Sequence, residues 1–182
     1  MDGNRQDRAK GTAAETLASL VARATGEHVA PDDVVDRGGS PSPSEHVGER
    51  LGTADSVVGV VPRIDPSLVE RLNRERTGES DDGDDGEHRN LAARIVLTGR
   101  ARETVTGPAG AVVRGGLSSD VRLYEHDGDS PVGLLLADDR AVVGAFDDAG
   151  LAAVLIAEEP AVRNWVAETF QRYLSAAEPL FE

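Results

Sequence analysis

The segment that decides the fold reads PVGLLLADDRAVVGAFDDAGLAAVLI, residues 131–156. It consists of three short apolar runs, separated by Asp-Asp-Arg and by Asp-Asp-Ala-Gly. Apolar runs of this length between Asp- and Gly-containing turns predict buried strands, and the short spacers favour an antiparallel meander. The acidic pairs Asp138-Asp139 and Asp147-Asp148 are therefore interpreted as hairpin turns and not as a paired general acid and base.

A helix is predicted directly after this meander, starting at Pro160, which suits the first turn of a helix. Its apolar residues fall on one stripe with helical spacing. The three aromatic members of that stripe are predicted to be the structural core of the domain: Trp165, Phe170 and Tyr173. Five of the six aromatic residues of the chain lie at or beyond position 131, so we expect the main core here.

Upstream of the meander, the sequence predicts alternating strands and helices. Residues 56–61 and 93–98 are apolar runs typical of buried strands, and Asp65-Pro66 starts an amphipathic helix between them. Residues 100–113 predict a weak helix in two pieces, interrupted at Gly107-Pro108, and 120–126 alternate as a strand with one solvated face. The predicted fold class is α/β, a mixed sheet that ends in an antiparallel meander flanked by helices.

The predicted organisation has three parts. Residues 1–26 are a polar tail followed by a helix over 12–25, which Thr12 caps and Glu15 completes as a capping box. Residues 27–53 have the Pro- and Gly-rich composition of a linker, with a short helix over 44–51 capped by Ser44. Residues 54–182 form the main domain, in which 78–90 is an acidic loop.

Composition limits the functions that the chain can have. It has 182 residues, a formal net charge of −14 and no cysteine, which excludes disulfides and thiolate metal sites. Eighteen of the 19 basic residues are arginine, and the acidic, lysine-poor composition is typical of a salt-adapted archaeal protein, an ordinary acidic protein of a GC-rich genome being the alternative. We expect no membrane span, a cytoplasmic location and no direct contact with nucleic acid, because the charge opposes binding to phosphates.

No metal, cofactor or catalytic motif is predicted. None of the four histidines is paired at the spacing of metal ligands, and the acidic loop lacks the bidentate Glu and flanking helices of an EF-hand. No nucleophile elbow, phosphate loop, dinucleotide fingerprint or zinc-protease motif is present. The sequence therefore favours a binding protein over an enzyme.

From about residue 27 to residue 181 the chain resembles the ligand-sensing region of archaeal TrmB-like and FilR-type winged-helix transcription regulators, in particular haloarchaeal ones. The segments that carry the resemblance are 54–62, 131–140, the turn at 146–150, and Trp165 with Tyr173. The resemblance implies a half of a phospholipase-D-like fold and a regulatory function. Members carry a winged helix-turn-helix before this region, and we expect it to be missing from the residues before position 54.

The resemblance also lets phosphodiester chemistry be tested on the sequence. Active enzymes of the phospholipase-D fold carry His-x-Lys-x-x-x-x-Asp on the strand that leads to Asp138-Asp139. Counted back from Asp138, the His and Lys positions hold Pro131 and Gly133, and counted back from Asp139 they hold Val132 and Leu134. The nucleophile and the phosphate-binding cation are absent, so we expect a scaffold kept for binding.

Two functions remain open at this point. In the first, the domain binds a small anionic or polyhydroxylated ligand beyond the carboxyl ends of its strands, where the sequence places Arg63, Thr98, Arg100 and Tyr124. The alternative for both arginines is pairing with surface carboxylates. In the second, the chain is a dimerisation module that forms homodimers, or heterodimers with full-length related regulators, through the helix over 12–25 and the Trp165 helix.

Overall fold

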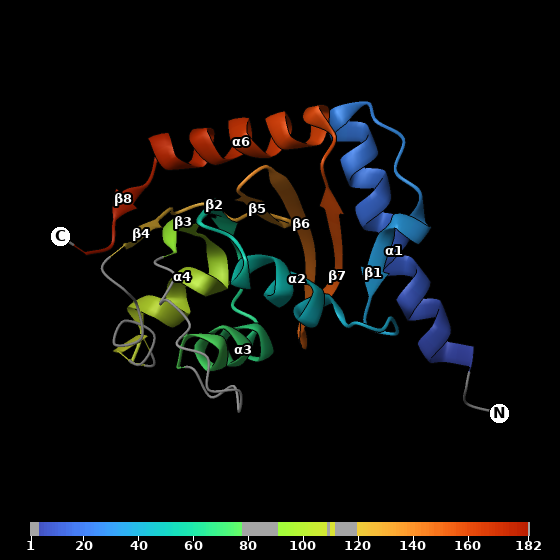
Figure 1. Ribbon diagram of the computed structural model, residues 1–182, viewed down its shortest axis with the longest axis horizontal. Coiled ribbons are helices and arrows are strands. Elements are labelled where there is room, and N and C mark those ends of the chain that lie inside the picture. The colour runs from blue at the N-terminus through green and yellow to red at the C-terminus, as the bar shows by residue number, and fades with distance from the viewer. Residues whose placement is uncertain (1–3, 78–90, 109, 112–119, 182) are drawn as a thin grey trace.

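The computed structural model describes residues 4–77, 91–108, 110–111 and 120–181, and Figure 1 shows their arrangement. In this part of the chain, eight strands form one mixed sheet in the order β1-β7-β6-β5-β2-β3-β4-β8. The strands are β1 Val34–Asp36, β2 Ser56–Val61, β3 Ala92–Leu97, β4 Val121–Glu125, β5 Gly133–Ala137, β6 Arg140–Asp147, β7 Gly150–Ala157 and β8 Glu178–Pro179. The helices are α1 Asn4–Thr25, α2 Pro43–Gly52, α3 Pro66–Thr77, α4 Gly99–Thr106 and α6 Pro160–Ser175, with a 3-10 turn η1 at Pro31–Asp33.

One half of the sheet is parallel. β2 pairs with β3, and β3 with β4, all in parallel register, and α3 and α4 are the crossovers between them. The residues of β2, SVVGVV, include no charged side chain, as expected for a strand that is covered on both faces. This half confirms the strand–helix–strand order predicted from the sequence.

The other half is the antiparallel meander β5-β6-β7, which joins the parallel half where β5 pairs antiparallel with β2. Its turns are as short as predicted. At the β5–β6 turn Asp138 has a φ of 52°, and its Oδ1 accepts a hydrogen bond of 3.0 Å from the Ser56 backbone N–H. That turn residue therefore also fixes the start of β2 against the end of β5.

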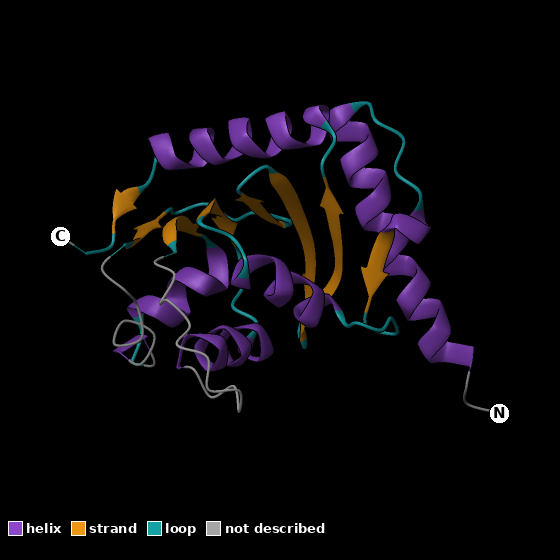
Figure 2. Cartoon of the chain, viewed as in Figure 1, coloured by secondary structure: helices purple, strands orange, loops and turns teal. Residues whose placement is uncertain are grey.

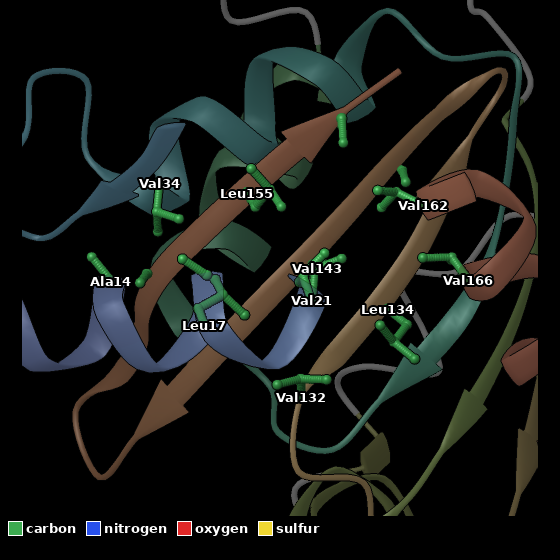
Figure 3. Packing of buried hydrophobic residues seen from close by; sticks show 14 residues of the cluster. Ala14, Leu17, Val21, Val34, Val132, Leu134, Val143, Leu155, Val162 and Val166 are labelled. Carbon is green, nitrogen blue, oxygen red and sulfur yellow. The ribbon is translucent and has the colours of Figure 1, made fainter. Parts of the chain in front are cut away.

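Helices cover both faces of the sheet, as Figure 2 shows. α1 and α6 pack on one face, and α2, α3 and α4 pack on the other. Figure 3 shows Leu17 and Val21 of α1 close to Val143 of the sheet, with Val162 and Val166 of α6 beside them. Side chains alternate between the two faces along each strand, which is why the apolar runs can serve two cores at once. The mixed α/β fold predicted from the sequence is confirmed.

The amino-terminal third differs from the predicted tail and linker. α1 begins at Asn4 and not at Thr12, because its first residues are mostly good helix formers and Gly11 alone does not end the helix. Residues 27–53 hold β1, which pairs antiparallel with β7, and α2, whose Val47 and Leu51 are buried. These residues are part of the packed domain.

The cap of α2 also differs from the prediction. Ser42, and not Ser44, is the N-cap: its side chain accepts a hydrogen bond from the Glu45 backbone N–H, and the Glu45 carboxylate accepts one from the Ser42 N–H. This reciprocal bonding is a capping box, with Pro43 in the first turn. The predicted acidic loop at 78–90, and most of the predicted second helical piece after Gly107, lie outside the described residues.

The three residues predicted as the structural core occupy different positions on α6. Phe170 is 1% exposed and packs on Val60 and Val96. Trp165 is only partly buried at the edge of the α1–α6 core, and Tyr173 is partly buried with its hydroxyl donating a 3.0 Å hydrogen bond to the Asp129 carbonyl. The helix is anchored on the sheet by Phe170.

We expect Phe170→Ala to lower the free energy of unfolding by about 3–5 kcal/mol, because it removes a fully buried aromatic ring. Trp165→Ala is expected to cost less, since part of the indole is already in contact with solvent. Urea unfolding of both variants, followed by circular dichroism, measures the difference. A larger loss for Trp165→Ala would contradict this assignment of the core.

Candidate functional site

The candidate site lies at the carboxyl edge of the parallel strands. β6 is antiparallel to β5 and β5 is antiparallel to β2, so β6 runs in the direction of β2. The β6–β7 turn consequently reaches the edge at which β2 and β3 end. Ligand sites of open α/β sheets are found beyond this edge.

A buried carboxylate fixes the β6–β7 turn in this place. Asp65 is 7% exposed, and its Oδ2 accepts a 2.8 Å hydrogen bond from the Leu151 N–H of the turn. Its Oδ1 accepts a 2.9 Å bond from the Leu68 N–H in the first turn of α3. Gly150 has a φ of +115°, and a Cβ at this position would lie 2.6 Å from Asp65 Oδ2. Only a glycine allows the turn to approach the carboxylate this closely.

A second contact ties the same turn to the segment after β1. Arg37 donates two hydrogen bonds to the Asp147 carboxylate, 2.6 Å and 2.5 Å long. This bidentate pair, together with a bond from the Ala149 N–H, holds the pKa of Asp147 below its ordinary value. The same hydrogen bond to Asp147 raises the pKa of Arg37.

The predicted ligand-binding arginines meet at the neighbouring residue, Asp148. Arg63 Nη1 lies 3.4 Å from Asp148 Oδ1, and Arg100 Nη1 lies 3.9 Å from the same oxygen. Arg63 also donates a 2.9 Å hydrogen bond to the Asp147 carbonyl. Arg63 and Arg100 thus come together as predicted for a site, and each is paired with a carboxylate, as in the alternative interpretation.

Thr98 is next to Arg100 in the chain but is buried. It is the N-cap residue of α4 and is 0% exposed, and its hydroxyl makes no hydrogen bond to the described part of the chain. Its backbone N–H donates to the Val61 carbonyl, which joins the ends of β2 and β3. Thr98 therefore positions the start of α4.

Tyr124 lies apart from this site. It packs on the α6 face of the sheet against Val60, Val96 and Phe170. In β4 the alternation of side chains puts Leu123 on the α4 face and Tyr124 on the opposite one. The structure therefore separates Tyr124 from Arg63 and Arg100.

Sequence reasoning missed the two residues that hold the site together. Arg37 was within the predicted linker, and Asp65 was interpreted only as the residue before a helix. The signal for Asp65 was present, because an Asp directly before Pro is a typical N-cap residue. Its second bond, to a residue 86 positions away, had no signal in the sequence.

The family comparison concerns the carboxyl-terminal part of the chain. Residues 87–176 match the family model of the middle domain of FilR1, a methanogenesis regulatory protein. This range covers just under half of the chain and includes β3, β4, the meander and α6. No curated protein matches the sequence.

Among solved structures, the chain is similar to TrmBL2, which is described as an archaeal chromatin protein with a novel mode of DNA binding. The TM-score is 0.54 at 19% sequence identity, and the match covers 96% of this chain and 64% of TrmBL2. At this identity the likeness shows a shared fold. The family match thus relates residues 87–176 to the middle domain of a regulatory protein, and the structural match shows the fold that the chain shares with TrmBL2.

Two further properties concern the described residues. None of the helices there is both long and apolar enough to cross a bilayer. The same residues contain no group of three or more His, Cys, Asp or Glu side chains arranged to hold a metal ion.

We expect Gly150→Ala to destabilise the protein more than Gly26→Ala. Both glycines have positive φ, but a Cβ at Gly26 meets nothing within 4 Å, whereas at Gly150 it collides with Asp65. Gly26→Ala thus measures backbone strain alone, and Gly150→Ala adds the loss of the Asp65 bond to Leu151, about 1–3 kcal/mol for a buried group left unpaired. Thermal and urea unfolding check the order, and equal losses would contradict this role of Asp65.

The lowered pKa of Asp147 predicts a loss of stability in acid. Because the folded-state pKa lies below the unfolded value near 3.8, the pair contributes stability above that value, and the contribution disappears as the pH falls through the folded-state pKa. The pair is about half exposed, so we expect a contribution of about 1 kcal/mol or less.

Asp147→Asn is therefore expected to be less stable at pH 7 and to lose less stability than the wild type on going from about pH 5 to pH 3. Urea unfolding at a series of pH values provides the measurement. Asp32→Asn, which removes one exposed carboxylate without a hydrogen-bond partner among the described residues, is the matched control. An Asp147→Asn curve parallel to the wild-type curve would show that the pair contributes nothing.

Proposed function

We propose that this chain is a non-catalytic regulatory domain of a TrmB- or FilR-type transcription regulator and that it binds a small anionic or polyhydroxylated ligand. The observation that carries the proposal is the match of residues 87–176 to the middle domain of a methanogenesis regulatory protein. The likeness in fold to TrmBL2 extends over nearly the whole chain and supports it. A domain of this kind works in the cytoplasm beside the transcription machinery.

The ligand site in this proposal is the pair Arg63 and Arg100. The two residues belong to different segments, the loop after β2 and the first turn of α4, so a ligand held by both fixes these segments together. The amino-terminal end of α4 adds the partial positive charge of a helix to the two guanidinium groups. Guanidinium forks suit both carboxylates or phosphates and the hydroxyl oxygens of polyols.

Asp148 acts as an internal competitor at this site. Its side chain is 94% exposed, and its contacts of 3.4 Å and 3.9 Å are long for charge-assisted hydrogen bonds. The Arg37–Asp147 pair next to it is short and bidentate. A ligand anion can therefore displace Asp148 while Asp147 keeps the turn in place.

Pairing with a second regulator chain is a separate proposal. The apolar stripe predicted for it on α1 includes Leu17 and Val21, which are 1% and 0% exposed because they pack on the chain's own sheet. That stripe is already used within the chain. A dimer contact therefore requires other surfaces, such as the Trp165 helix α6, the second contact predicted from the sequence.

The ligand-binding proposal is tested by screening dicarboxylates, sugar phosphates and neutral sugars for an increase in melting temperature, followed by calorimetric titration of each stabilising compound. A compound present at 100 times its Kd stabilises the folded state by about 2.7 kcal/mol. We expect Arg63→Gln/Arg100→Gln to abolish this shift and Asp148→Asn to tighten the binding of an anionic compound several-fold. Arg172→Gln, which changes an exposed arginine on α6, is the matched control.

Two results would contradict the proposal. The first is a ligand whose affinity is the same for the wild type and the double variant. The second is turnover of a phosphodiester by the purified protein that disappears in Asp139→Asn. Either result moves the function away from Arg63 and Arg100.

A further inference from the structure

A second pair of arginines lies on the opposite face of the parallel strands. Arg94 of β3 and Arg122 of β4 are register partners in the parallel pairing. The residues two positions further along, Val96 and Tyr124, pack against α6, so both arginines project from the α6 face as well. Neighbouring strands are about 4.8 Å apart, so the two side chains leave the sheet next to each other and both guanidinium groups can reach one ligand.

Neither arginine is neutralised within the described part of the chain. Both are exposed, and no described carboxylate forms an ion pair with either of them, although the chain has 33 acidic residues. Asp120 is two positions before Arg122 and is exposed, but it makes no ion pair with Arg122 or Arg94. Like charges on adjacent strand positions repel each other, so this arrangement costs stability that no carboxylate in the described structure offsets.

Arg94 is held in place by an aromatic ring. Its guanidinium carbon lies 6.0 Å from the centre of the Phe170 ring, and Phe170 is fixed in the core. A guanidinium packed over a ring keeps the N–H groups at its edge available for hydrogen bonds in its plane. The contact lowers the conformational entropy that Arg94 loses when it binds an anion.

α6 does not cover the part of the sheet that holds Arg94 and Arg122. Near its start, Arg163 donates to the Asp139 carbonyl at the β5–β6 turn, and near its end Tyr173 donates to the Asp129 carbonyl. These two contacts lie at opposite edges of the sheet, so the helix crosses the sheet diagonally, and Figure 1 shows it leading from the end of β7 to β8. Arg94 and Arg122 lie near the amino-terminal ends of β3 and β4, outside that diagonal, where Ala92 is exposed as well.

We propose that Arg94 and Arg122 form a binding site for a dianionic phosphate group. Two guanidinium groups supply a charge of +2 and two forks of N–H donors, which match the charge and the terminal oxygens of a phosphate monoester better than a single carboxylate. The group belongs to a small molecule, because the net charge of −14 repels a polyanion such as DNA. This site is independent of Arg63 and Arg100, which end on the carboxyl edge of the sheet.

The test is a titration with inorganic phosphate, followed by the NMR signals of the arginine Nε–H groups of the full chain at constant ionic strength set with potassium chloride. We expect the Arg94 and Arg122 signals to shift together with one Kd. Arg94→Gln and Arg122→Gln should each weaken phosphate binding roughly tenfold, the effect of losing charge-assisted hydrogen bonds. Arg172→Gln is the matched control and should leave the Kd unchanged.

A further titration tests whether the bound phosphate group can be part of a phosphate monoester as well as inorganic phosphate. A phosphate monoester such as glycerol phosphate should show the same dependence on both residues, and Arg94→Lys, which keeps the charge but loses the fork, should stay several-fold weaker. Melting temperatures show whether each variant is folded. The NMR titration of the wild-type protein tests the site without any substitution. Equal shifts at all exposed arginines, or an equal effect of Arg172→Gln, would mean an adventitious ion only and overturn the proposal. Binding of a DNA duplex that requires Arg94 and Arg122, without a response to phosphate, overturns it too.

Discussion

The buried Asp65 carboxylate is the contact on which the geometry of the carboxyl edge depends. One oxygen caps α3, which belongs to the parallel half, and the other holds the backbone of Leu151 in the antiparallel half. Burial of a carboxylate is unfavourable unless hydrogen bonds and nearby positive charge offset it, and here two backbone N–H groups and the amino-terminal end of α3 do so. The two halves are thereby joined by a bond that no pairing of adjacent strands provides.

The β6–β7 turn, which is fixed at Gly150, carries two ion pairs of different strength on the consecutive residues Asp147 and Asp148. Asp147 is held by the bidentate Arg37, whereas Asp148 points into solvent at a longer distance from Arg63 and Arg100. Exposed ion pairs contribute little to stability, so the loose contact can be exchanged for a ligand at small cost. The short pair keeps the backbone of the turn in place during such an exchange.

Much of the fold could be predicted because it follows from local patterns. The meander, β2, β3 and α6 are apolar runs or stripes bounded by Asp, Gly or Pro, and each has a length typical of its element. β1 could not be predicted, because it has three residues and exists through its pairing with β7 more than 100 positions away. A short strand of this kind is surrounded by the Pro and Gly residues that also define a linker.

The candidate site was predictable to the same extent. The rule that ligands bind beyond the carboxyl ends of strands brought Arg63 and Arg100 to one edge, and both arginines are found there. Asp148, the carboxylate that both arginines contact, could not be predicted from this rule, since its position depends on Asp65 and on the direction of β6. Tyr124 lies on the face opposite Leu123, away from the two arginines, and the alternation along β4 already indicates this.

The preference for arginine over lysine has a structural basis in two of these contacts. Arg37 uses two nitrogens at once on Asp147, and Arg94 packs over a phenyl ring. A lysine ammonium is a point charge that supplies the charge of each contact but neither the fork nor the flat face. In a chain with 33 acidic residues, charge alone would allow many pairings. The planar geometry of the guanidinium group selects among them, and so determines which carboxylates are held and which arginines stay available.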